Sequence, residues 1–101
     1  MAKTIEIVTF RLLDGVTEKD FVEETTSMER GLLGKLQGFM DRDTGLDDDG
    51  NCLVVLHWES AEDAQASMDK FVDAPETKPF TSMIDMGTFQ MKRYTLEDHY
   101  Q

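Results

Sequence analysis

Residues 52–64 read Cys-Leu-Val-Val-Leu-His-Trp-Glu-Ser-Ala-Glu-Asp-Ala, and they join a strand to a helix. From Cys52 to Trp58 the chain is apolar at odd and even positions alike until its end, which is typical of a strand covered on both faces. Ser60, followed by Asp63 three residues later, has the spacing of a capping box, so we expect a helix to begin there. One face of this helix is expected to be lined by Ala61, Ala64, Met68, Phe71 and Val72.

A second pair of strand and helix comes earlier in the chain. Residues 4–12 are dense in β-branched and aromatic side chains and predict a strand, which ends at the turn Asp14-Gly15. Thr17 and Asp20 repeat the capping-box spacing. The helix that they open carries one apolar stripe, formed by Phe21, Thr25, Met28 and Leu32.

Two further strands complete the pattern. Residues 39–44 predict a more polar strand, which a turn-rich hairpin at residues 45–51 connects to the next strand. Both prolines lie in residues 73–83, where at most one short helical turn fits. Residues 87–94 are expected to form the last strand.

The order β-α-β-β-α-β predicts a ferredoxin-like α+β fold, with a four-stranded antiparallel sheet and both helices on one face. No internal repeat or linker interrupts the chain. We therefore expect residues 1–101 to form a single domain.

Composition bounds the class of protein. The chain has 101 residues, with 10 Lys and Arg against 21 Asp and Glu, so its formal net charge is −11. Such a surface repels nucleic acid and anionic membranes, and no apolar run approaches the ~18 residues of a membrane span. No apolar signal segment follows Met1, and the one cysteine, Cys52, suits a reducing compartment. We expect a cytoplasmic protein that binds neither nucleic acid nor membrane.

The sheet face opposite the helices has no segment of this chain left to cover it. Exposing several apolar side chains to solvent there would lower the free energy of unfolding by several kcal/mol, which is comparable to the whole stability of a small domain. A second copy stacked across a two-fold axis removes this cost, so we predict a homodimer. Its interface is expected to contain Ile5, Ile7, Thr9, Arg11, Val55 and His57, with His57 near Thr9 or Arg11.

Few residues carry chemistry. The acidic run at residues 47–50 lacks the ligand pattern of a calcium loop, and His57 and His99 have no partner at zinc-ligand spacing, so we expect no metal and no cofactor.

His57 is interpreted as a hydrogen-bonded interfacial histidine, with a catalytic base as the alternative. Glu6 shares its strand face with apolar residues, and burial there would raise its pKa and make it a candidate base. The alternative is a carboxylate that reaches solvent at a strand edge.

Several segments carry a family resemblance: Phe10-Arg11-Leu12-Leu13-Asp14-Gly15, Gly38-Phe39 and Trp58-Glu59-Ser60-Ala61-Glu62-Asp63-Ala64, continuing through Phe71, Pro75 and Phe80 to Ile84. In these the chain resembles the antibiotic-biosynthesis-monooxygenase-like family of dimeric α+β barrels. The resemblance implies a homodimer whose two sheets close a barrel, with a substrate pocket between sheet and helices in each subunit. The residues that would line it are Val8, Phe10, Met28, Val54, Trp58, Met68, Phe71 and Phe80.

The family includes cofactor-independent oxygenases of phenols and anthrones, isomerases and haem-degrading enzymes. Haem chemistry is disfavoured, because the Asn, Trp and His of those members correspond here to Val8, Ser67-Met68 and Phe80-Thr81. Oxygenase members often carry an Asn four residues before the Trp, where this chain has Val54.

The resemblance therefore implies a cofactor-independent monooxygenase of an aromatic or quinol-like molecule, in which Glu6 removes a proton and Trp58 is a wall or hydrogen-bond donor of the pocket. The alternative is a non-catalytic dimer that binds a small molecule or is associated with stress. An RNA-recognition module of the same strand order is excluded, because the third strand lacks the basic and aromatic run that stacks bases.

Overall fold

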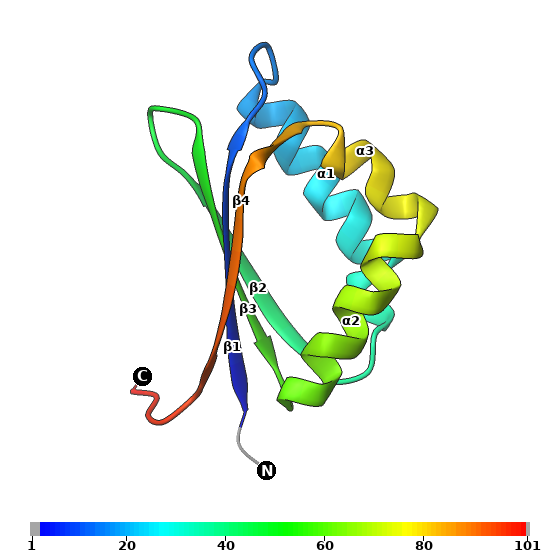
Figure 1. Cartoon of the computed structure of the whole chain (residues 1–101), viewed down its shortest axis with the longest axis vertical. Helices are drawn as coiled ribbons and strands as arrows, with labels where there is room; N and C mark the ends of the chain where they lie inside the picture. Colours follow the sequence, from blue (N-terminus) through cyan, green and yellow to red (C-terminus); the bar gives the residue numbers. More distant parts are fainter. Residues whose placement is uncertain (1–2, 101) are drawn as a thin grey trace.

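The computed structural model describes residues 3–100 (Figure 1). The chain has the expected β-α-β-β-α-β order, with three additional short helical segments, of which η1 and η2 are single 3₁₀ turns. The elements are β1 (Thr4–Leu12), α1 (Glu18–Gly31), η1 (Leu33–Lys35), β2 (Phe39–Leu46), β3 (Asn51–Trp58), α2 (Ala61–Asp73), η2 (Pro75–Thr77), α3 (Lys78–Thr81) and β4 (Ile84–Thr95). No helix among the described residues is long and apolar enough to cross a membrane.

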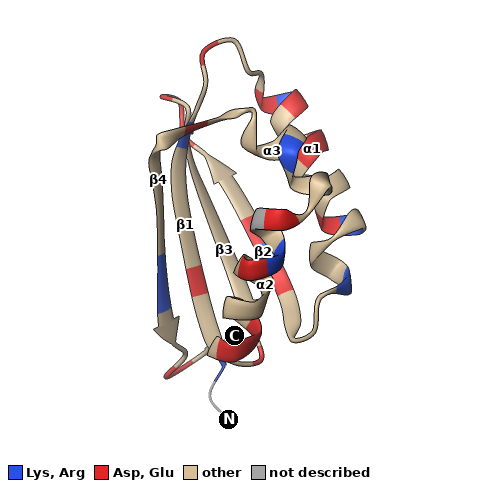
Figure 2. Ribbon diagram, turned by 45° about the vertical axis from the view of Figure 1, so that its right-hand side comes forward, with Lys and Arg blue, Asp and Glu red and all other residues tan. Residues whose placement is uncertain are grey.

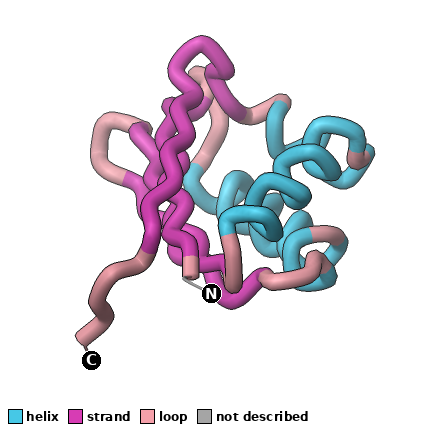
Figure 3. The backbone as a smooth tube through the Cα atoms, turned by 60° about the horizontal axis from the view of Figure 1, so that its bottom comes forward, coloured by secondary structure: helices cyan, strands magenta, loops and turns pink. Residues whose placement is uncertain are grey.

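The four strands form one antiparallel sheet in the order β2-β3-β1-β4. Strand β1 is central and pairs with β3 on one side and with β4 on the other. The helices lie together on one face of the sheet (Figures 1 and 3). This is the ferredoxin-like architecture that the order of elements predicts.

Both predicted helix starts are confirmed. The Thr17 hydroxyl accepts a hydrogen bond from the Asp20 amide, and the Ser60 hydroxyl accepts one from the Asp63 amide, each at 3.1 Å. These caps satisfy backbone donors that the first helical turn leaves unpaired. The apolar stripe predicted for α1 differs from the structure at its last residue. Leu32 is the C-cap of the helix, and Leu33, in the following 3₁₀ turn, is the leucine that is buried.

The last third of the chain departs from the predicted boundaries. Strand β4 begins at Ile84, which is buried and pairs with Leu12, rather than at residue 87. A register shift between Thr9 and Arg11 makes this longer pairing fit, and the Arg11 amide donates instead to the Thr88 hydroxyl at 2.8 Å. Residues 75–81 form two short turns where one was expected, because each proline occupies a first-turn position that needs no amide.

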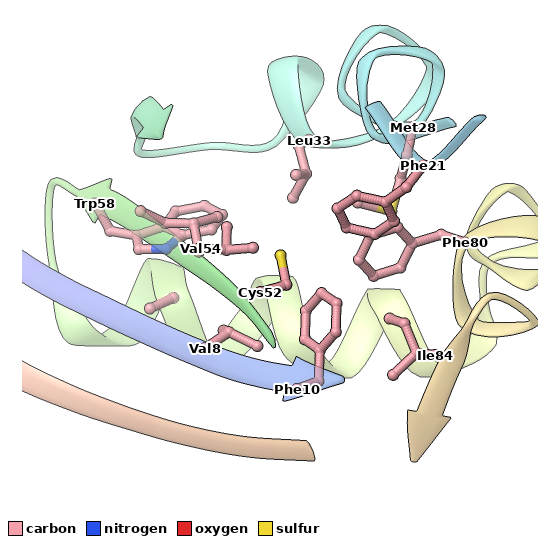
Figure 4. Close-up of a cluster of buried hydrophobic side chains, with 12 residues drawn as sticks. Val8, Phe10, Phe21, Met28, Leu33, Cys52, Val54, Trp58, Phe80 and Ile84 are labelled. Carbon is pink, nitrogen blue, oxygen red and sulfur yellow. The ribbon is translucent and has the colours of Figure 1, made fainter. Parts of the chain in front are cut away.

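The core lies between the sheet and the helices and is built around Phe10. Its ring makes edge contacts with Phe21 of α1 and Phe80 of α3, at centroid distances of 5.7 and 5.9 Å, and stacks on Phe89 of β4 at 6.3 Å. Figure 4 shows the labelled rings of Phe10, Phe21 and Phe80 converging from three different elements. Such edge-to-face contacts add stabilisation beyond the burial of area.

Alternation along β1 assigns its two faces. Glu6, Val8 and Phe10 are buried beneath the helices, whereas Ile5 and Ile7 on the opposite face are only partly covered. Glu6 is thus buried in the helix-covered layer, and the alternative of a carboxylate that reaches solvent at a strand edge is wrong.

Candidate functional site

A cavity of about 60 Å³ lies between the sheet and the helices. Seven of the eight expected pocket residues line it: Val8, Phe10, Met28, Val54, Met68, Phe71 and Phe80. The side chains come from β1, β3, α1, α2 and α3, so the cavity depends on the packing of helices against sheet. The candidate base Glu6 also lines it, at a mostly apolar wall.

Trp58 is not among the residues that line the cavity, in contrast to what the resemblance implies. It is fully buried and packs edge-on against Phe39, with ring centroids 5.5 Å apart. The reason is register: Trp58 pairs with Thr4 at the start of β1, beyond Glu6. Its side chain therefore belongs to the core at that end of the sheet.

The carboxylate of Glu6 is bound by Arg93, a residue that no pattern in the sequence indicated for the site. Arg93 Nε lies 2.7 Å from Glu6 Oε2, and Glu6 and Arg93 are cross-strand partners in the pairing of β1 with β4. Arg93 also donates to Gln65 Oε1 of α2 at 2.7 Å. Figure 2 shows this basic segment of β4 beside the acidic segment of β1. The buried charge of Glu6 is thereby compensated.

A second polar group lies on β2 at the other side of the cavity. Arg42 and Thr44 both line the cavity, two residues apart on the same face of the strand. Arg42 donates to the carbonyl of Thr25 at 3.0 Å and to Glu29 Oε2 at 3.2 Å, which ties β2 to α1. From the sequence, residues 39–44 were predicted only to be a more polar strand, and neither residue was proposed for the site.

The open sheet face carries the six residues predicted for an interface: Ile5, Ile7, Thr9, Arg11, Val55 and His57. The predicted neighbours of His57 are wrong. Antiparallel pairing sets His57, near the end of β3, opposite Ile5 at the start of β1, far from Arg11. Its Nδ1 instead lies 2.6 Å from Asp41 Oδ1. Arg11 binds the hairpin through Asn51 Oδ1 at 2.8 Å.

Two groups outside the cavity have shifted pKa values with structural causes. Burial raises the pKa of the Cys52 thiol from 9.0 to about 11, so the side chain acts as a small apolar core residue. Hydrogen bonds from Asn51 lower the pKa of Asp47, whose carboxylate closes the hairpin. Among the side chains that the structure describes, no three of His, Cys, Asp or Glu are grouped as metal ligands would be.

Solved structures of other proteins share this fold. SnoaB, a cofactor-independent oxygenase from Streptomyces nogalater, superposes with a TM-score of 0.77 at 9 % identity, over 98 % of this chain and 97 % of that one. A monooxygenase from the gene ActVA-Orf6 of Streptomyces coelicolor, solved with nanaomycin D, gives 0.76 at 18 % identity, over 99 % and 92 %. A candidate antibiotic biosynthesis monooxygenase from Bordetella bronchiseptica gives 0.78 at 13 % identity, over 96 % and 99 %.

These superpositions cover nearly all of each chain and establish the architecture. The chain therefore has the ferredoxin-like fold of antibiotic-biosynthesis-monooxygenase-like structures. Neither a scan of protein-family models nor a search of curated proteins finds a match. The likeness is one of fold, and activity has to be argued from the site.

Proposed function

We propose that the cavity beneath the helices binds a small aromatic or quinol-like molecule, and that the protein oxidises this molecule with O₂ without a cofactor. One observation carries the proposal: an apolar cavity, walled by Val8, Phe10 and Phe80, has the buried carboxylate of Glu6 in its lining. Apolar cavities with a few polar groups are the usual form of small-molecule sites. Solved structures with the same fold include monooxygenases.

The size of the cavity sets a condition on binding. A volume of about 60 Å³ exceeds the space for one water but is well below that of typical ligand pockets. Met68 and Phe71 of α2 and Phe89 of β4 are only partly buried, so these lining side chains can move aside at lower cost than the fully buried ones. Methionine is suited to this, because its unbranched side chain repacks readily.

The chemistry requires removal of a proton from the substrate in a place that excludes water. Arg93 binds Glu6 Oε2, so we assign Glu6 Oε1 as the oxygen that accepts the proton. The substrate carbanion then reacts with O₂ to form a peroxide anion, and Glu6 returns its proton to this anion to give the hydroperoxide. Loss of water from a methylene-derived peroxide leaves a carbonyl, so that one oxygen atom enters the product and the other leaves as water.

A non-catalytic binding protein on the same scaffold is the second candidate. The Glu6–Arg93 ion pair favours it, because Arg93 Nε already occupies Glu6 Oε2 at 2.7 Å and ties the carboxylate to its cross-strand partner on β4. Both candidates require the cavity to bind a small molecule, and they differ only in whether turnover follows.

A thermal-shift screen of quinols, flavins and haem tests the binding, since a ligand of the folded state raises the melting temperature. Quinol hits are then followed by oxygen consumption in the wild type and in Glu6→Gln. We expect consumption in the wild type and its loss in Glu6→Gln, with binding retained. Binding without oxygen consumption would favour the second candidate, and unchanged turnover in Glu6→Gln would remove the base role of Glu6.

We also propose that two copies associate through the open sheet face. Leu53 and Tyr94 on this face are each 44 % exposed, and Ile5, Ile7 and Val55 are partly exposed beside them. Stacking this face on its own copy would bury one continuous apolar strip and complete a barrel. The cavity lies on the other side of the sheet, so each subunit would keep its own site.

A further inference from the structure

Two residues that line the cavity each have a buried side-chain atom without a hydrogen-bond partner in the protein: Arg42 Nε and Thr44 Oγ1. Among the side chains that the structure describes, one other atom, Trp58 Nε1, is also buried without a partner, and Trp58 lies outside the lining. Buried polar atoms nearly always have a hydrogen-bond partner. Two unpaired atoms on neighbouring cavity-lining residues therefore indicate that a ligand or a water molecule pairs with them.

The guanidinium of Arg42 is held in place by its other nitrogens. They donate to the Thr25 carbonyl at 3.0 Å and to Glu29 Oε2 at 3.2 Å, and the Arg42 side chain is 11 % exposed. The remaining Nε–H is therefore fixed in direction before any ligand binds. Thr44, two positions along β2, adds a hydroxyl on the same face of the strand.

The register places these donors opposite Glu6 across the floor of the cavity. Arg42 pairs with Leu56 of β3, and Leu56 pairs in turn with Glu6 of β1, so the three lie in one row across the sheet. Two strand spacings separate the backbones of β2 and β1 by about 10 Å. A flat ring lying on Leu56 can therefore meet the donors with one edge and the carboxylate with the other.

The chemistry of the donors selects the ligand. An Arg Nε–H only donates, and a threonine hydroxyl can donate beside it, so together they suit one electron-rich oxygen. We propose that Arg42 and Thr44 form an oxygen-binding site for the ionised hydroxyl or the carbonyl oxygen of an aromatic ligand. The inference rests on the proposed function in one respect, that the cavity admits an aromatic molecule.

The test compares two probes of nearly equal shape, 4-nitrophenol at a pH at which it is ionised and nitrobenzene, which lacks the hydroxyl. Binding is measured by equilibrium dialysis, and the absorbance of the nitrophenolate reports its environment. We expect the wild type to bind 4-nitrophenolate about tenfold more tightly than nitrobenzene. Thr44→Val and Arg42→Lys should each weaken nitrophenolate binding about tenfold and leave nitrobenzene binding within about twofold.

Thr44→Ser is the matched control, because it keeps the hydroxyl and should keep most of the nitrophenolate affinity. Thr44→Val is nearly isosteric, so the test does not depend on whether Arg42→Lys folds. Nitrophenolate binding that is unchanged in Thr44→Val would mean that the two atoms pair only with water, and it would overturn the oxygen site while leaving the cavity as a binding site. Failure of the wild type to bind either probe would overturn the proposed function together with this inference.

Discussion

Arg93 and Glu6 lie 87 positions apart in the sequence, yet Arg93 Nε is 2.7 Å from Glu6 Oε2. The pair is well shielded, because the Glu6 side chain is 5 % exposed and that of Arg93 is 23 % exposed. Through Gln65 the same guanidinium reaches α2. One side chain thus joins the edge strand, the central strand and a helix at the wall of the cavity.

Replacing Arg93 with Met should therefore destabilise the protein strongly, because it leaves a buried carboxylate without a partner. We expect the free energy of unfolding to fall by about 2–3 kcal/mol, somewhat less than for a fully buried pair because Arg93 is partly exposed. Urea denaturation at neutral pH measures it. The double variant Glu6→Gln with Arg93→Met should recover much of the loss, and a change below about 0.5 kcal/mol in the single variant would contradict the role of the pair.

In the ligand-free protein, a substitution at the proposed oxygen site should stabilise the fold, in contrast to the loss expected for Arg93→Met. Thr44→Val removes a buried hydroxyl that has no partner in the protein, so we expect the free energy of unfolding to rise by about 1 kcal/mol. The control is Thr88→Val, because the Thr88 hydroxyl accepts from the Arg11 amide and donates to the Asp85 carbonyl at 2.7 Å. The free energy of unfolding of Thr88→Val should fall by about 1 kcal/mol, because a paired hydroxyl is lost. Equal losses in both variants would show that the Thr44 hydroxyl is already well paired.

Much of the fold could be predicted because its signals are local. The caps at Thr17 and Ser60 lie within three residues of their partners, and the residues of β1 carry strand propensity without interruption. The start of β4 could not be found in this way. Ile84 joins the strand only because the register shift near Arg11 lets it pair with Leu12, and no local pattern encodes a shift in a partner strand at the other end of the chain.

The residues of the candidate site also divide into those that a local pattern predicts and those that it does not. Apolar lining residues such as Val8 and Phe10 follow from alternation on a strand with one covered face. Arg42, Thr44 and Arg93 were missed because a polar residue in a strand is ordinarily assigned to the solvent face. Placing them under the helices requires the pairing register of all four strands, which the hydrophobic pattern of these polar segments specifies weakly.

Cys52 should behave as a protected thiol with a measurable effect on stability at high pH. Its pKa is raised from 9.0 to about 11 by burial, so the folded state holds a proton that the unfolded state releases earlier. The associated stability is complete below pH 9.0 and is lost as the pH rises toward about 11. Urea denaturation of the wild type and Cys52→Ala across this range isolates the effect from lysine and tyrosine titration. Parallel pH profiles for the two proteins would contradict it, as would rapid reaction of the native thiol with Ellman's reagent.

Association through the open sheet face can be tested by one charge placed at its centre. Val55 pairs with Ile7 in the middle of that face, so two-fold stacking of a Val55→Lys variant would bring two ammonium groups into a dry, apolar contact. In the isolated subunit the lysine stem can lie along the sheet with its ammonium in water, so the variant should still fold. We expect sedimentation equilibrium at micromolar protein to show a dimer for the wild type and an 11.5 kDa monomer for Val55→Lys. Val22→Lys makes the same change on α1, where Val22 is 45 % exposed and away from the sheet, and it should remain dimeric. A wild type that sediments as a folded monomer would show that solvent tolerates the apolar strip, and the barrel would then have to be abandoned while the cavity beneath the helices would stand.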